Sequence, residues 1–67
     1  MPDAYTFDDG GTLRRFKSRA DMYDWMIDND HMILEGDDAS KFASHVQRSK
    51  SANAAKVTAE LTKHGVI

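Results

Sequence analysis

The segment DDGG at residues 8–11 lies between two short runs rich in aromatic and β-branched residues, and it constrains the fold more than any other feature. Adjacent glycines supply the positive φ angles that a tight hairpin turn needs, and runs of this kind favour strands. The sequence therefore predicts an N-terminal β-hairpin. A turn of even length places Phe16 on the face of Tyr5 and Phe7, whereas a three-residue loop places Arg15 there instead. We favour the even turn because it gathers three aromatic rings on one face.

Ser18 predicts a helix N-terminus, because serine is a favoured N-cap and an acidic residue, Asp21, follows three positions later. We expect this helix to end near Asn29. Its apolar residues cover an unusually wide arc, and its aspartates are confined to one narrow edge. The apolar set is Ala20, Met22, Tyr23, Trp25, Met26 and Ile27, and the acidic edge is Asp21, Asp24 and Asp28.

The run Met-Ile-Leu at residues 32–34 is either a short strand or an extended linker, because three residues are too few to show a period. Asp37 or Asp38 is expected to cap a second helix over residues 38–49, which has apolar residues at helical spacing. This helix should break at the polar segment SKSAN, residues 49–53.

A third helix is expected to begin after a cap at Ser51 or Asn53 and to end near Lys63. Gly65 suits the position just after a helix C-cap, where a left-handed conformation is common. Residues 66 and 67 should then return to the core, in one interpretation as an edge strand.

Together these elements predict an α+β fold: an N-terminal β-hairpin followed by three short helices around one small core, in a single domain over residues 1–67. Eighteen large apolar side chains, from Tyr5 to Ile67, are enough for such a core. A chain of this length is near the lower size at which a domain folds alone. A homodimer would add buried surface, and it predicts a melting temperature that depends on concentration.

Several classes of protein are excluded by what the sequence lacks. Without cysteine there is no disulfide framework and no cysteine-based zinc site. The N-terminus does not resemble a signal peptide, and the longest apolar run is too short to cross a bilayer, so we expect a cytoplasmic protein with no membrane partner. Serines occupy cap-like or surface positions and no glycine-rich phosphate loop is present, so we expect neither an enzyme nor a cofactor.

A metal site is not expected either. The segment DNDHMILEGDD, residues 28–38, supplies oxygen ligands but departs from the calcium-loop pattern, because Met32 stands at the third ligand position and Ile33 at the glycine position. The three histidines lack zinc-like spacing.

Charge is distributed unevenly along the chain. Residues 1–36 hold eight acidic and four basic side chains, whereas residues 37–67 hold three and five, within a net charge of −2. Between residues 21 and 38 there are seven carboxylates and no lysine or arginine. Crowded like charges disfavour an isolated helix, so the acidic edge is either a solvated face or a docking surface for a basic partner.

Two binding hypotheses follow. In the first, a small non-enzymatic accessory or regulatory module, of a kind that bacteria, phages and plasmids encode, docks on a larger protein to modulate or inhibit it. The predicted protein-binding residues are Asp21, Met22, Asp24, Trp25 and Asp28, since aromatic and methionine side chains are common at adaptable interfaces. The alternative is a DNA- or RNA-binding regulator that uses the basic stripe of the two C-terminal helices. Its residues are Lys41, His45, Arg48, Lys50 and Lys56.

Overall fold

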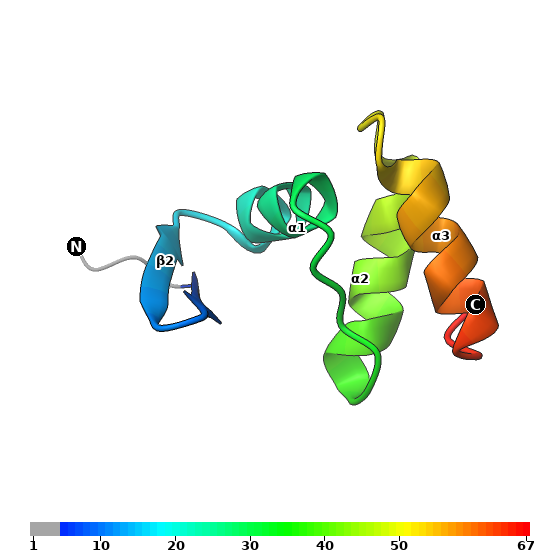
Figure 1. Cartoon of the computed structure of the whole chain (residues 1–67), viewed down its shortest axis with the longest axis horizontal. Helices are drawn as coiled ribbons and strands as arrows, with labels where there is room; N and C mark the ends of the chain where they lie inside the picture. The colour runs from blue at the N-terminus through cyan, green and yellow to red at the C-terminus, as the bar shows by residue number, and fades with distance from the viewer. Residues whose placement is uncertain (1–4) are drawn as a thin grey trace.

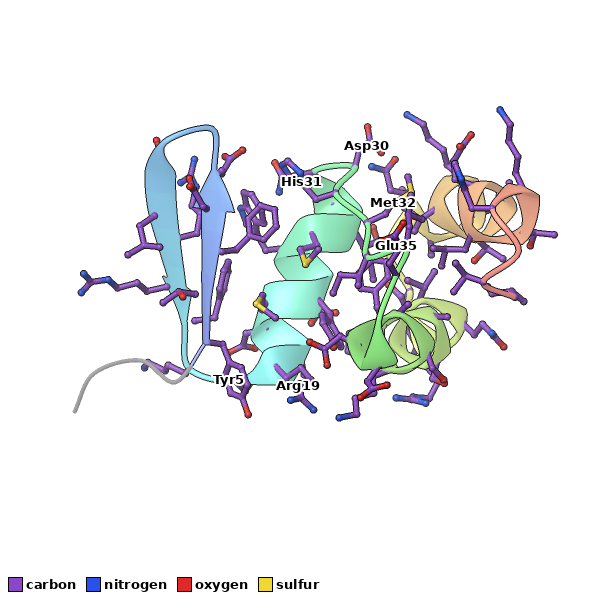
Figure 2. The ribbon with its side chains drawn as sticks, turned by 90° about the horizontal axis from the view of Figure 1, so that it is seen from below. Tyr5, Arg19, Asp30, His31, Met32 and Glu35 are labelled. Atoms are coloured by element: carbon purple, nitrogen blue, oxygen red, sulfur yellow. The ribbon has the colours of Figure 1, made fainter. Side chains whose placement is uncertain are left out.

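A computed structural model describes residues 5–67, and within them five elements follow in chain order (Figure 1). The strands are β1 (Tyr5–Asp9) and β2 (Thr12–Phe16), and the helices are α1 (Arg19–Asp28), α2 (Asp37–Arg48) and α3 (Ala54–Lys63). The predicted α+β class, with a hairpin before three helices, is confirmed. The hairpin lies on one side of α1, and α2 and α3 lie together on the other side (Figures 1 and 2).

The hairpin has the two-residue turn that the sequence favours. Gly10 and Gly11 have φ angles of 58° and 94°, values that match a type I′ turn and fit the twist of the strands. The antiparallel register pairs Tyr5 with Phe16, and Phe7 is two residues from Tyr5 on the same strand. All three aromatic side chains therefore share one face, and it is the face that meets α1, because Phe7 and Phe16 contact Trp25.

Helix α1 begins as predicted. The Ser18 side chain accepts a hydrogen bond from the Asp21 backbone N–H at 3.1 Å, and Asn29 is the C-cap. Its wide apolar arc has a physical explanation, since the helix is covered on two opposite sides. One side belongs to the main core through Tyr23, Met26 and Ile27, and the other carries Trp25 toward the hairpin.

The segment between α1 and α2 is an extended linker, so the strand considered for residues 32–34 is not formed. A strand needs a neighbour with free backbone hydrogen bonds, and the only sheet of the described residues is the hairpin on the far side of α1. Met32 and Ile33 pack instead against the core, whereas Leu34 is exposed.

The cap predicted for α2 is wrong by one or two residues. Gly36, with a φ of 84°, occupies the N-cap, and Asp37 and Asp38 lie inside the first turn without a side-chain cap bond. Carboxylates are also favourable there, because the N-terminal end of a helix carries partial positive charge. Glycine readily adopts the positive φ at which the chain changes direction between the linker and the helix.

The core lies where the three helices meet. It is formed by Tyr23, Met26 and Ile27 of α1, Phe42, Ala43 and Val46 of α2, and Ala54, Val57 and Leu61 of α3. Helix α3 ends at Lys63, as the sequence predicts, and Gly65 follows the C-cap His64 with a φ of 79°. The Val66 N–H then donates to the Leu61 carbonyl at 2.9 Å, and Val66 packs on the core. No edge strand forms at residues 66–67, because this turn points them back along their own helix.

Candidate functional site

The acidic edge of α1 faces the C-terminal end of α2 rather than open solvent alone. Asp24 accepts a hydrogen bond from His45 Nε2 at 2.7 Å, although the Asp24 side chain remains 60% exposed. One turn later, Asp28 accepts a hydrogen bond from the Ser51 hydroxyl. Asp21, in the first turn, is exposed. Two of the three carboxylates that looked unsupported in the sequence therefore have partners from elements far along the chain.

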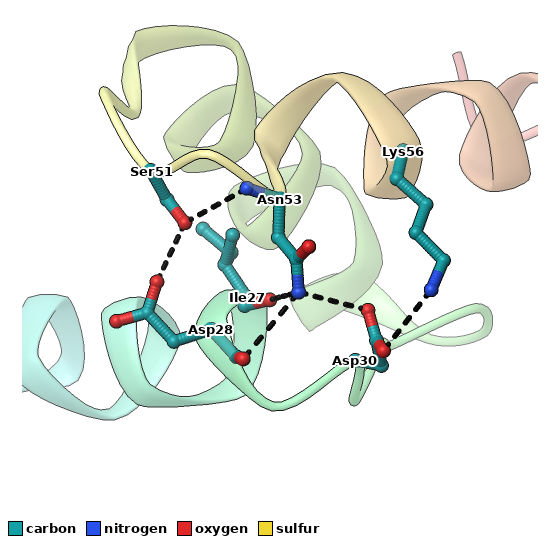
Figure 3. Close-up of polar contacts among 6 residues, drawn as sticks. All are labelled: Ile27, Asp28, Asp30, Ser51, Asn53 and Lys56. Carbon is teal, nitrogen blue, oxygen red and sulfur yellow. Dashed lines mark hydrogen bonds and ion pairs between the residues drawn. The ribbon is translucent and has the colours of Figure 1, made fainter.

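Asn53 ties the end of α1 to the start of α3 (Figure 3). Its side-chain amide donates to the backbone carbonyls of Ile27 and Asp28, at 3.2 and 3.4 Å, and to Asp30 Oδ1 at 3.0 Å. The other Asp30 oxygen pairs with Lys56 Nζ at 3.1 Å. Asn53 is at the N-cap position of α3, as one of the two predicted caps, but its side chain makes no cap bond and serves the neighbouring helix instead.

An open hollow of about 390 Å³ lies nearby, between α1, the C-terminal end of α2 and the segment after α2. We call it the mixed-charge hollow. Its lining residues are Asp24, Asp28, His45, Arg48, Ser49, Lys50 and Ser51. Residues from both predicted sites, the protein-binding and the nucleic-acid-binding, therefore meet in one place.

Aspartate, histidine and serine in one hollow have the composition of a hydrolytic triad, but their bonds differ from one. Ser51 donates to Asp28 rather than to an imidazole, and its oxygen also accepts from the Asn53 backbone N–H at 3.2 Å. A serine nucleophile needs a general base within hydrogen-bond reach of its hydroxyl. Here both hydrogen-bonding roles of the hydroxyl are used to hold the chain between α2 and α3.

Trp25, the predicted centre of a docking surface, is half-buried in an aromatic cluster. Its ring lies 5.6 Å from that of Phe7 and 5.9 Å from that of Phe16, and it stacks on His31 at 5.2 Å with an interplanar angle of 13°. The Arg14 guanidinium lies 5.4 Å from the same ring. These contacts within the chain explain the wide apolar arc of α1, for which the sequence alone showed no packing partner. Met22, also half-buried, packs against the core.

The residues predicted for nucleic-acid binding are divided among three surroundings. Lys41, His45 and Arg48 form one stripe, as their helical spacing predicts, along a second opening of about 390 Å³. Lys50 lines the mixed-charge hollow, and Lys56 is paired with Asp30.

We call this second opening the cationic groove. It runs between α1 and α2, and α1 contributes Arg19 and Tyr23 to its walls. Burial, and to a smaller degree the nearby Asp38 carboxylate, raises the pKa of Tyr23 above its ordinary value of 10.0. Sequence reasoning did not include either α1 residue in a predicted site, since Tyr23 belonged to the apolar arc of its helix and Arg19 to a separate group of cations near the end of the hairpin.

Over residues 5–67, no three histidine, aspartate or glutamate side chains converge in a way that could hold a metal ion. None of the helices described is both long and apolar enough to span a membrane.

Comparison with known proteins gives no match: no family model, no curated protein and no solved structure matches the chain.

Proposed function

We propose that the protein is a small non-enzymatic module that binds another protein through the mixed-charge hollow and the adjoining acidic edge of α1. The main observation behind this proposal is that acidic and basic side chains line the same hollow. Two carboxylates, Asp24 and Asp28, lie in it beside the cations Arg48 and Lys50. A surface that alternates in sign within one concavity suits a partner that also carries both signs.

The same lining argues against a nucleic-acid backbone at this place. A phosphate that approached Arg48 and Lys50 would also approach Asp24 and Asp28, and like charges in one concavity repel. Nucleic-acid binders usually carry a clearly basic surface, whereas this chain has a net charge of −2. A protein partner can place a basic side chain against the aspartates and an acidic one against the cations.

The proposal also moves the centre of the docking surface away from Trp25. That side chain already contacts the hairpin rings, so a partner that used it would have to displace contacts within the chain. Asp24 and Asp28 instead remain exposed at the rim of the hollow despite their hydrogen bonds. Charged groups at such a rim act mainly on association rate and on selection of the partner.

The test is affinity capture from a native lysate with nuclease treatment, followed by binding kinetics with the purified partner. The variant D24K/D28K should slow association and weaken its dependence on salt. The matched control is Glu35→Lys, an exposed charge reversal in the linker. A milder variant, D24N/D28N, keeps the side-chain shape and guards against loss of fold, which circular dichroism monitors.

A captured protein that survives nuclease and binds Glu35→Lys normally but D24K/D28K weakly supports the proposal. Equal affinity for all variants would contradict the docking surface. Capture that disappears after nuclease treatment would favour the nucleic-acid alternative, as would a mobility shift at ~50 mM salt that is lost at higher salt.

A further inference from the structure

The cationic groove differs from the mixed-charge hollow in having no carboxylate in its lining. Its walls carry three cations, Arg19, Lys41 and Arg48, together with the hydroxyls of Ser40 and Ser44. Within residues 5–67 these three cations form no ion pair, whereas Arg14 and Lys56 are both paired with aspartates. Like charges around one concavity repel each other, so binding of an anion there would be electrostatically favourable.

Arg19 contacts the ring of Tyr5, and this contact does not use the N–H groups of its guanidinium. Its guanidinium carbon lies 5.5 Å from the centroid of the Tyr5 ring, and Figure 2 shows the two residues next to each other at the lower edge of the view. A guanidinium that rests on a ring is attracted through its face, so its N–H groups remain available to an oxyanion. The hairpin thereby positions a side chain of the groove.

Tyr23 supplies a second, independent observation. The residue forms part of the groove wall and is 2% exposed, and its buried hydroxyl has no hydrogen-bond partner among the described residues. Nearly all buried polar groups in folded proteins are paired, so this hydroxyl is a donor still without an acceptor, although its oxygen is closed off from the open groove. The raised pKa of Tyr23 keeps the hydroxyl protonated, and therefore able to donate, at ordinary pH.

We propose that the cationic groove binds a small phosphate-bearing ligand, with phosphate oxygens against Arg19, Lys41 and Arg48, and that its wall opens enough on binding for the Tyr23 hydroxyl, which is closed to solvent in the free protein, to donate a hydrogen bond. The forked donors of arginine match the geometry of phosphate oxygens, and lysine adds a point charge. A volume of about 390 Å³ is at the lower end of the range for small-molecule sites, which suits a compact ligand. This site goes beyond the proposed protein-binding function, because it lies in a different concavity.

The test is an NMR titration of the isotope-labelled protein with pyrophosphate, at an ionic strength held constant with sodium chloride. Amide shifts should concentrate in residues 19–23 and 40–48 and should include the side-chain N–H groups of Arg19 and Arg48. Lys41→Ala and Arg48→Ala should each weaken pyrophosphate binding by about tenfold or more, since hydrogen bonds to charged groups are strong. The control, Arg15→Ala, removes an exposed hairpin cation that also forms no ion pair within residues 5–67, and it should bind like the wild type.

Tyr23→Phe separates a binding role from a structural one. Removal of an unpaired buried hydroxyl should leave the melting temperature of the free protein unchanged or higher. The rise in melting temperature that pyrophosphate produces should nevertheless shrink, because the ligand binds the folded state less tightly. If this variant fails to fold, Lys41→Ala and Arg48→Ala still test the site, because both replace exposed side chains.

Three results would overturn the site. The first is a shift pattern spread evenly over all nine lysines and arginines, which would indicate nonspecific screening. The second is an equal loss of binding in Arg15→Ala and Lys41→Ala. The third is binding of a short DNA duplex without binding of pyrophosphate, which would assign the cations to a nucleic-acid backbone instead.

Discussion

The mixed-charge hollow and the cationic groove both lie against α1 and share His45 and Arg48 of α2, yet they differ in charge. In the hollow, the late turns of α1 contribute Asp24 and Asp28, whereas in the groove its early turns contribute Arg19 and Tyr23. Helix α2 offers a similar basic stripe to both. The charge of each concavity therefore depends on which turns of α1 lie opposite the basic stripe of α2.

His45 lies at the boundary between the two concavities. Its ring contacts Tyr23 edge-on, with centroids 5.5 Å apart, while Nε2 is bonded to Asp24. The hydrogen bond directs the imidazole toward the hollow. The cations of the groove therefore depend on Arg19, Lys41 and Arg48 alone, which is why the predictions below concentrate on these side chains and on the groups that hold the hollow.

The largest effect is expected from Asn53→Ala. The substitution removes three hydrogen bonds that join α3 to the end of α1, and it leaves two backbone carbonyls without that donor. We expect a loss of about 1–3 kcal/mol in the free energy of unfolding. Thermal unfolding should show it as a fall of about 4–8 °C in melting temperature per kcal/mol.

The control for this substitution is Gln47→Ala, which removes an exposed amide of α2. In Asn53→Ala the NMR signals that line the hollow should move, whereas those of Arg19 and Lys41 in the groove should stay in place. Equal melting temperatures for the two variants would mean that Asn53 does not hold the hollow together.

The next largest effect should separate the two concavities by their cations. Lys41 lines only the groove, Lys50 only the hollow, and Arg48 lines both. Alanine at Lys41 should therefore weaken pyrophosphate binding alone, by about tenfold, and alanine at Lys50 should affect partner binding alone. Arg48→Ala should weaken both. Titration calorimetry measures pyrophosphate binding, and kinetics with the purified partner measure protein binding. Loss of pyrophosphate binding in the Lys50 variant would contradict the assignment of the two ligands to separate concavities.

A smaller effect is expected from Asp24→Asn. It removes a negative charge from the hollow while an amide oxygen can still accept from His45. Because one fewer carboxylate then lies near the groove, pyrophosphate should bind more tightly, by a factor of about two for each unit of ligand charge if the separation is on the order of 10 Å in water. Weaker binding in this variant would indicate that Asp24 orients a group that the ligand needs.

The smallest effect concerns alkaline pH. Since the pKa of Tyr23 is raised in the folded state, the unfolded chain loses this proton first as pH rises above 10.0. The stabilisation is complete below that pH and is lost as pH increases through the higher folded pKa. Urea unfolding from pH 9 to 11 should therefore show a steeper loss in the wild type than in Tyr23→Phe, and parallel curves would contradict the burial of a protonated hydroxyl.

The sequence by itself determined the local features of this protein. The two glycines defined the hairpin turn and so the face shared by Tyr5, Phe7 and Phe16. Ser18 located the start of α1, and Gly65 the turn after α3. These features depend on backbone conformation and on hydrogen bonds over three or four residues, and for that reason residue type alone predicts them.

Only the tertiary structure decided how the helix faces meet. His45 and Asp24 are 21 residues apart in the chain, and Asn53 and Ile27 are 26 apart. Such pairs depend on the path of the linker and on the angle at which helices pack, which no local pattern encodes. The contact of Trp25 with the hairpin, the hydrogen bonds that Asp24 and Asp28 accept from His45 and Ser51, and the cluster of cations beside Tyr23 all follow from that packing.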